Sequence, residues 1–211
     1  NNNLQIESNY VEVTKMLDPE SFTDAHILNI FIRNTDWPGN NIKYWKRMGG
    51  YKPNEKKGLD GRWRWFVHDT DFGFGLDFIY VPGVEEGPAH NTLAMATAAN
   101  GPSWPNPSWS TLILRKLLEN SEYKKHFILR FSDLLNTEFK SENTVAKLNA
   151  FEDEYSPEIN EHIHRWRRPV NKNEWISNIA LMRSFATQRP NYVRTHIKEY
   201  FNLQESHTIT L

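Results

Sequence analysis

The sequence predicts one α+β domain, residues 1–211, that is mostly helical and has a few short strands near its middle. Three observations lead to this prediction. Apolar residues recur at helical spacing through most of the second half of the chain. Two short segments in the first half have the composition of strands, and the second of them alternates charged and aromatic residues. The length of 211 residues suits a single ordinary domain.

The composition excludes several classes of protein. Lys and Arg number 25 and Asp and Glu number 26, a balance that argues against a protein that binds nucleic acid through bulk charge. The chain has no cysteine, which excludes a disulfide scaffold, a thiol nucleophile and a thiolate metal site. No apolar run approaches the roughly 20 residues that a membrane span needs, so we predict no membrane span.

The first predicted helix follows Asp18 and ends near Arg33. Asp18 can cap the helix, Pro19 suits its first turn, and the charge of Glu20 is favoured near a helix N-terminus. Residues 22–32 then present a broad apolar face, so we expect this helix to be buried.

Two strands are predicted at residues 42–46 and 62–68, and residues 51–61 form a polar connection between them. After the second strand, residues 76–109 are rich in Gly, Pro and Asn. This composition predicts a long loop, and long loops in compact domains are often functional.

The rest of the chain predicts a block of helices whose apolar stripes follow helical spacing. These helices are Ser110–Leu118, Glu122–Leu135, Ser141–Tyr155, Pro157–Arg167, Asn173–Ala186 and Pro190–Phe201. We expect four tryptophans to lie in the core and two others, in the Pro-rich loop, to be available to a substrate. The first four are Trp63, Trp65, Trp166 and Trp175, and the other two are Trp104 and Trp109.

Two loops carry residue types that suit catalysis. The first acidic loop, residues 34–41, contains Asp36 and, five positions later, Asn41. The second acidic loop, residues 69–75, has aspartates at its first and third positions. Carboxylate and carboxamide oxygens are hard ligands that suit Mg²⁺ or Mn²⁺ rather than Zn²⁺.

The order of these residues matches a pattern for phosphoryl transfer. In protein kinases a catalytic Asp is followed five positions later by a metal-binding Asn, and a later Asp-Phe-Gly holds metal against the phosphates. This chain has Asp36 with Asn41 and then Asp71-Phe72-Gly73, in the same order. Asn34-Thr35 stands in place of the usual His-Arg. Each short motif is weak alone, and the two together favour a phosphotransferase.

Longer stretches around both loops carry a family resemblance. Residues 34–45 read NTDWPGNNIKYW and residues 62–75 read RWRWFVHDTDFGFG. Both resemble the CotH kinase family, the spore-coat protein H-like atypical protein kinases, and they are the most specific part of the likeness. Residues 166–169 (WRRP) and 182–190 (MRSFATQRP) are similar to the helical tail of that family. The resemblance therefore spans nearly the whole chain.

The resemblance implies a protein-kinase-like C-terminal lobe, whose short strands carry the acidic loops, and an enzyme that uses ATP with Mg²⁺ or Mn²⁺. It implies Ser or Thr acceptors on exported proteins, in the extracellular space or at the cell surface. Carried onto this chain, Asp36 is the catalytic carboxylate, and Asn41 and Asp71 bind the metal–nucleotide cofactor. Asp69 is a further metal ligand, and either Asp69 or Asp71 is the principal one. Residues two apart on a strand point to the same side, so both carboxylates could reach one metal pair.

A protein kinase also needs a β-rich lobe before the catalytic loop, with a Lys for the phosphates and a Glu that holds this Lys. Only 35 residues precede Asp36, too few for that lobe. We therefore expect this chain to be mainly the C-terminal lobe. Alone, it should bind nucleotide poorly and transfer phosphate inefficiently.

Three other interpretations stay open. An aspartate in a turn is usually a structural turn residue. A kinase-like lobe can lose its chemistry and act as a non-catalytic surface-binding or adhesion module, for which residues 87–109 offer an aromatic loop. A glycoside hydrolase would use Asp36 with Asp69 or Asp71 as carboxylates about 5 Å or about 6.5–9.5 Å apart. The hydrolase ranks last, because it gives Asn41 and the Phe-Gly pair after the last aspartate no special role.

Overall fold

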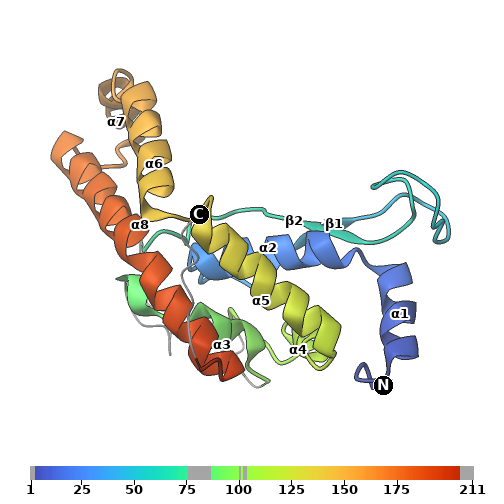
Figure 1. Ribbon diagram of the computed structural model, residues 1–211. Helices are drawn as coiled ribbons and strands as arrows, with labels where there is room; N and C mark the ends of the chain where they lie inside the picture. The colour runs from blue at the N-terminus through green and yellow to red at the C-terminus, as the bar shows by residue number, and fades with distance from the viewer. Residues whose placement is uncertain (1–2, 76–86, 100, 102–103, 205–211) are drawn as a thin grey trace.

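The computed structural model describes residues 3–75, 87–99, 101 and 104–204. It has the predicted α+β architecture, mostly helical with a two-stranded antiparallel sheet (Figure 1). None of the helices in these segments is long and apolar enough to cross a membrane. In chain order the elements are α1 (Glu7–Met16), α2 (Pro19–Phe31), β1 (Lys43–Trp45), β2 (Arg64–Phe66), the short 3₁₀ helix η1 (Gly87–Ala89), α3 (Thr92–Thr97), α4 (Leu112–Leu117), α5 (Ser121–Asn136), α6 (Ser141–Tyr155), α7 (Ile159–Trp166) and α8 (Lys172–Phe201).

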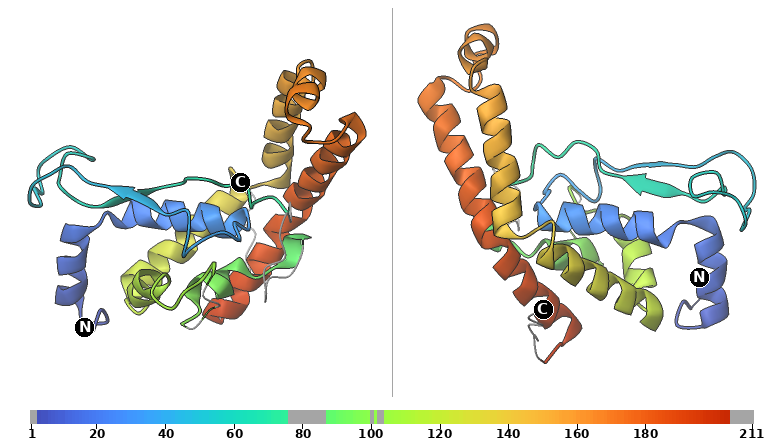
Figure 2. Two further views of the ribbon diagram at one scale, coloured as in Figure 1. Left: turned by 180° about the vertical axis from the view of Figure 1, so that it is seen from behind. Right: turned by 45° about the horizontal axis from the view of Figure 1, so that its top comes forward.

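The molecule consists of a body and a projecting arm (Figures 1 and 2). Helices α2, α3, α4 and α5 and the second half of α8 form the body. The arm is a helical hairpin, in which α6 leads outward, α7 lies at the tip and the first half of α8 returns to the body. The two strands run beside α2.

Helix α2 forms the centre of the core, as its apolar sequence predicts. The Asp18 carboxylate accepts hydrogen bonds from the backbone N–H groups of Glu20 (3.1 Å) and Ser21 (3.4 Å), and Pro19 occupies the first turn. Full burial of one large apolar side chain contributes about 1.5–3 kcal/mol to stability. Buried apolar side chains from α2, α5 and α8 form one cluster, which includes Phe22, Ile27, Ile30, Phe31, Tyr123, Phe127, Phe131, Leu135, Val193 and Ile197.

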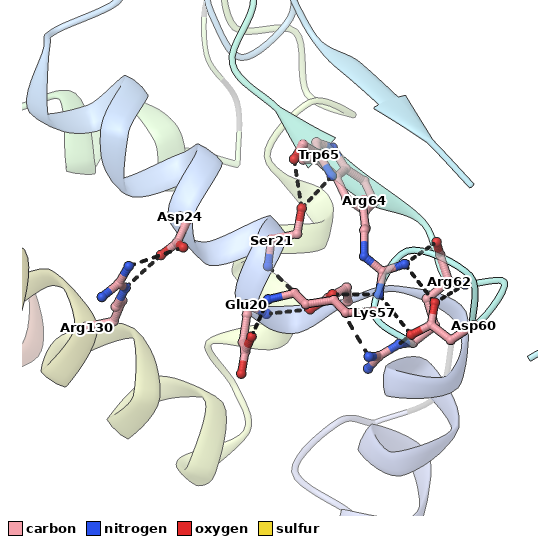
Figure 3. A network of polar contacts seen from close by, with 10 residues as sticks. Glu20, Ser21, Asp24, Lys57, Asp60, Arg62, Arg64, Trp65 and Arg130 are labelled. Carbon is pink, nitrogen blue, oxygen red and sulfur yellow. Dashed lines mark hydrogen bonds and ion pairs between the residues drawn. The ribbon is translucent and has the colours of Figure 1, made fainter. Parts of the chain in front are cut away.

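A buried ionic network holds the N-terminal end of α2 (Figure 3). The Arg64 guanidinium donates to both carboxylate oxygens of Asp60, at 2.7 and 2.8 Å, and lies 2.9 Å from the Asp18 carboxylate. Arg62 donates to Asp60 as well, at 2.7 Å. The Arg64 guanidinium holds the pKa of Asp60 well below its usual value, against the opposing effect of burial. Strand β2 is thereby joined to the cap of α2.

The small sheet is tied to α2 by backbone contacts too. Residues Lys43, Tyr44 and Trp45 pair with Phe66, Trp65 and Arg64, in that order. The Ser21 hydroxyl donates to the carbonyl of Trp65 (2.7 Å) and accepts its N–H (3.0 Å). The strands therefore run in a fixed register along α2, and the loops that precede and follow them start from fixed points.

Arg189 of α8 holds the opposite, C-terminal end of α2. Its side chain is fully buried, with 0% of its surface exposed. Burial, and then the nearby charge of Arg33, lower its pKa. Its guanidinium donates five hydrogen bonds of 2.6–3.0 Å, to the carbonyls of Ile30, Phe31, Pro88 and His90 and to the hydroxyl of Thr92.

Helix α8 corrects the prediction of two helices on either side of residues 187–189. It is continuous over 30 residues and runs through Pro190. A proline inside a helix removes one backbone hydrogen bond and usually kinks or ends the helix. Here Pro190 is buried, and the five hydrogen bonds of its neighbour Arg189 fix this turn against α2 and α3. Tertiary contacts outweigh the local preference.

Helices also form where the sequence predicted none. Helix α1 forms in a polar segment because Tyr10 and Val13 pack against the core cluster. Helices η1 and α3 lie inside residues 76–109, which were predicted to be loop, and the Asn91 side chain caps α3. Residues 76–86 of that predicted loop lie outside the described part of the chain.

The prediction of four core tryptophans is wrong for two of them. Trp63 and Trp166 expose 36% and 60% of their surface, whereas Trp65 and Trp175 are half-buried. Trp166 ends α7 at the tip of the arm, where the guanidinium of Arg165 lies 5.0 Å from its ring centroid. Local patterns do not separate a ring that faces the core from one on a projecting arm.

Candidate functional site

Both acidic loops meet at the C-terminal end of α2. The first acidic loop follows α2 directly, and the second follows β2. The backbone N–H of Phe74 in the second loop donates to the carbonyl of Ile32, at 2.8 Å, just after the last turn of α2. Within the second loop, the N–H of Gly73 donates to the carbonyl of Thr70, at 2.9 Å. The two loops therefore lie side by side on one helix end.

The buried side chain of Asn34 connects the two loops. Its Oδ1 accepts the backbone N–H of Asp36, at 3.2 Å. Its Nδ2 donates to the backbone carbonyl of Asp69, at 3.3 Å, and to the side-chain oxygen of Asn29 on α2, at 2.9 Å. In the sequence, Asn34 stands out only as a departure from the His-Arg of protein kinases. The sequence did hold a signal for this contact: Asn29 lies on an otherwise apolar face of the helix, and a buried asparagine needs a polar partner.

The Asp36 carboxylate is half-buried, and three side chains in the described part of the chain donate to it. Its Oδ1 accepts from Asn40 Nδ2 at 3.0 Å and from Trp104 Nε1 at 2.7 Å. Its Oδ2 accepts from Asn41 Nδ2 at 2.7 Å. The structure thus brings Asp36 and Asn41, which the sequence placed in one site, into direct contact.

Trp104 reaches Asp36 because residues 104–107 pack tightly on the first acidic loop. The N–H of Gly39 donates to the carbonyl of Pro105, at 2.7 Å. A Cβ on Gly39 would lie 2.2 Å from the Cδ of Pro107, so only glycine permits this approach. The Trp104 ring also meets the ring of Phe72 edge to face, with centroids 6.3 Å apart. Trp104 therefore contacts both acidic loops.

Asp69 and Asp71 supply the remaining negative charge of the site. Burial raises the pKa of Asp71, the adjacent Asp69 carboxylate raises it further, and the charge of Asp36 adds to the effect. Asp36 and the Asp69–Asp71 pair therefore lie on neighbouring loops at one end of α2, with charges that act in the same direction on Asp71. That the three carboxylates act as one catalytic site stays a prediction.

Two of these residues have left-handed backbone conformations. Asn41 has φ +50° and Asp69 has φ +53°. Asn and Asp tolerate this region better than other residues with a side chain, although it still costs free energy. Such conformations persist where surrounding contacts fix them, and here the contacts of Asn34 and Asp36 do so.

The donor atoms of the site suit a hard divalent cation. The charges that raise the pKa of Asp71 are the carboxylates of Asp69 and Asp36. Because both are negative, they would stabilise a cation placed beside them. Asn41 uses its amide nitrogen on Asp36, which leaves its Oδ1 as a further oxygen donor. Within the described part of the chain, no three His, Asp or Glu side chains form a group that could hold a metal ion alone. Mg²⁺ is commonly held by one or two carboxylates with phosphate and water oxygens, which is the arrangement this donor set fits.

The chain matches a model of a known protein family. A family model described as CotH kinase protein matches residues 1–193 of the 211. The matched range includes both acidic loops, Asn34, Trp104 and Arg189. Neither the curated proteins nor the solved structures gave a match.

Proposed function

Because the chain belongs to the CotH kinase family, we propose that it is the C-terminal, catalytic lobe of an atypical ATP-dependent protein kinase. Its acceptors are Ser or Thr hydroxyls of exported or cell-surface proteins. Export is inferred from the resemblance to spore-coat protein H. The observation that carries the proposal is the contact between Asp36 and Asn41, beside the Asp69–Asp71 pair.

Asp36 acts on the acceptor hydroxyl. Its carboxylate accepts a hydrogen bond from the hydroxyl and takes the proton as the acceptor oxygen bonds to the γ-phosphorus of ATP. The bond between that phosphorus and the oxygen bridging to the β-phosphate breaks, and ADP leaves. Asn40, Asn41 and Trp104 fix the direction of the carboxylate, so that the hydroxyl is met in one orientation.

Asn41, Asp69 and Asp71 would hold the metal ion. Mg²⁺ or Mn²⁺, when bound, neutralises phosphate charge and orients the γ-phosphate for in-line attack. The role of Asp69 and Asp71 in this chain is to present two carboxylates from one short loop. Asn34 supports this role, because it fixes the Asp69 carbonyl relative to the backbone of Asp36.

The proposal is tested by charge-neutralising substitutions in the full-length protein. Asp36→Asn and Asp71→Asn should each reduce transfer of radiolabelled phosphate from ATP, in the presence of Mn²⁺, by about 100-fold or more. The readout is autophosphorylation together with labelling of a dephosphorylated general protein acceptor. Asp153→Asn, at an exposed position of α6 on the arm, is the matched control and should retain full activity. Full activity in both site variants would contradict the proposal.

Thermal unfolding separates a kinase from a non-catalytic surface-binding module. A shared nucleotide–metal site predicts that ATP and Mn²⁺ together raise the melting temperature by more than the sum of their separate effects. A folded full-length protein that shows neither this synergy nor phosphate transfer would be a binding module on a kinase-like scaffold.

A further inference from the structure

We propose that Trp104 is a positioning residue that selects which oxygen of Asp36 receives the acceptor hydroxyl. The inference rests on the proposed function and adds a residue from outside the two acidic loops. It follows from the distribution of hydrogen-bond donors around the Asp36 carboxylate, from the way in which Trp104 is held, and from the position of Asn41.

The two carboxylate oxygens of Asp36 differ in the number of hydrogen bonds that they accept. Each oxygen of an ionised carboxylate can accept about two hydrogen bonds. Oδ1 already accepts two, from Asn40 at 3.0 Å and from the Trp104 indole N–H at 2.7 Å. From the residues that the structure describes, Oδ2 accepts one, from Asn41 at 2.7 Å. Among these residues, the remaining position for a hydroxyl donor is therefore on Oδ2.

The Trp104 indole is fixed in place from several sides. The next residue, Pro105, accepts the N–H of Gly39 in the first acidic loop, at 2.7 Å. The ring packs edge to face on Phe72 of the second acidic loop. Asn106 is buried, and its side chain donates to the carbonyl of Met95 in α3, at 2.5 Å. A donor held in this way keeps the carboxylate from rotating, because rotation would break a short bond that has no easy replacement.

The free position on Oδ2 sets the side from which the acceptor hydroxyl approaches Asp36. The hydroxyl that binds Oδ2 lies on the side of the carboxylate that Asn41 contacts. Asn41 is also the residue whose remaining oxygen we assign to the metal. The acceptor oxygen and the metal-bound phosphate would then approach from one side, which suits in-line transfer. Trp104 itself touches neither ATP nor the acceptor in this arrangement.

The test is Trp104→Phe in the full-length protein. Phenylalanine keeps an aromatic ring against Phe72 and removes the N–H. The kcat for phosphate transfer should fall about 10- to 100-fold, while the KM for ATP stays within about twofold, because the orientation of the base changes and ATP contacts do not. Trp166→Phe, at the exposed tip of the arm, is the control and should leave both constants unchanged.

A double-mutant cycle distinguishes positioning from a general structural role. In an Asp36→Asn background, adding Trp104→Phe should cause no further loss of kcat, since the group that Trp104 positions is already neutralised. A purely structural residue would lower activity by the same factor in both backgrounds. Equal factors, or an unchanged kcat in Trp104→Phe when the unsubstituted protein is active, would overturn the inference.

A measurement that does not depend on activity completes the test. In a protein labelled with ¹⁵N-tryptophan, the indole N–H resonance that disappears in Trp104→Phe should shift in Asp36→Asn, because its hydrogen bond loses a charged acceptor. A resonance that does not move would overturn the contact and the inference with it. If the full-length protein transfers no phosphate, the proposed function fails, and the catalytic role of Trp104 fails with it. Loss of the Trp104 effects in an active enzyme overturns this inference alone.

Discussion

At the scale of single residues, the main feature of the site is the negative charge that Asp36, Asp69 and Asp71 bring to it. Burial and the Asp69 carboxylate favour the protonated form of Asp71. The folded protein therefore binds a proton at Asp71 more readily than the unfolded chain does. Without a cation, the contribution of Asp71 to stability falls as pH rises through its raised pKa.

Metal binding should reverse this effect, and it should depend on pH. We expect Mn²⁺ to raise the melting temperature near pH 7 and to lose this effect as pH is lowered toward about 4, since protons compete for Asp71. The loss should begin at a higher pH than for an ordinary aspartate. Melting curves with and without Mn²⁺ across this range measure it. Asp71→Asn should show little Mn²⁺ effect at any pH, and an effect equal to that of the unsubstituted protein would contradict the prediction.

His26 should make the body sensitive to acid. It is buried in α2, and its ring stacks on that of Phe22, with centroids 3.8 Å apart. The ring of Trp37 in the first acidic loop meets it edge to face, with centroids 5.1 Å apart. Burial lowers its pKa from 6.5 to about 4. Because the unfolded chain gains the proton first, about 3 kcal/mol of stability should be lost as pH falls from about 6.5 to about 4.

Urea unfolding between those pH values measures the contribution of His26. His26→Phe keeps a ring between Phe22 and Trp37 and removes the titrating group, so its stability should change less with pH over this range. The slope, rather than the stability at one pH, is the readout, because the larger ring changes packing as well. A slope equal to that of the unsubstituted protein would show that another group is responsible.

At this scale, the sequence could predict contacts between residues that lie close together in the chain. The spacing of Asp36 and Asn41 placed them on one loop, and their side chains are in contact. The parts played by Asn34 and Trp104 could not be predicted, because their partners are set by tertiary structure. Asn34 contacts a carbonyl 35 residues away, and Trp104 contacts a carboxylate 68 residues away. No local pattern encodes such distances.

At the scale of elements, α2 is the support for the site. Arg64 and Asp60 hold its first turn, and Arg189 holds its last, so the acidic loops start from a helix end with fixed position. The loop after α2 must also meet residues 104–107 closely. At Gly39, the backbone of this loop lies directly against Pro105 and Pro107.

Gly39→Ala should separate the first acidic loop from residues 104–107. The added Cβ would lie 2.2 Å from Pro107 Cδ and 2.6 Å from the Pro105 carbonyl, so one segment must move. We expect a loss of about 1–3 kcal/mol in stability from this overpacking, and a shift of the Trp104 indole resonance. Gly50→Ala, where nothing lies within 4 Å of the added Cβ, is the matched control. Urea unfolding that places the two variants at equal stability would contradict the prediction.

The elements that the sequence predicted well are those with long periodic patterns. Helices α2, α5 and α6 were predicted nearly to their ends, since each has a cap or an apolar stripe of several turns. The six residues of α3 are too few to show a period. The break predicted before Pro190 followed the local rule for proline, which the buried contacts of Arg189 override.

At the scale of the whole molecule, the body and the arm differ in how much they bury. The arm has few fully buried apolar side chains, among them Leu148 and Ile159, while Phe151 and Tyr155 are more than half exposed. Arg183 of α8 forms an ion pair with Glu152 and donates to Asn149 at 2.8 Å across the hairpin. Surface pairs of this kind add little stability.

The arm should therefore open more readily than the body. Amide hydrogen exchange should be faster in α6 and α7 than in α2 and α5, because local opening costs less where little apolar surface is buried. Leu148→Ala should increase exchange in the arm further and leave that of the body unchanged. Equal protection in arm and body would contradict the prediction and would mean that the hairpin is stabilised by contacts beyond its own core.

The bridging amide of Asn34 has a consequence for how relatives are judged. A descendant that kept every aspartate but exchanged this asparagine for an apolar residue would retain a complete acidic signature while its two loops drifted apart. Under the function proposed above, a count of carboxylates would not detect this change, whereas inspection of this one uncharged position would.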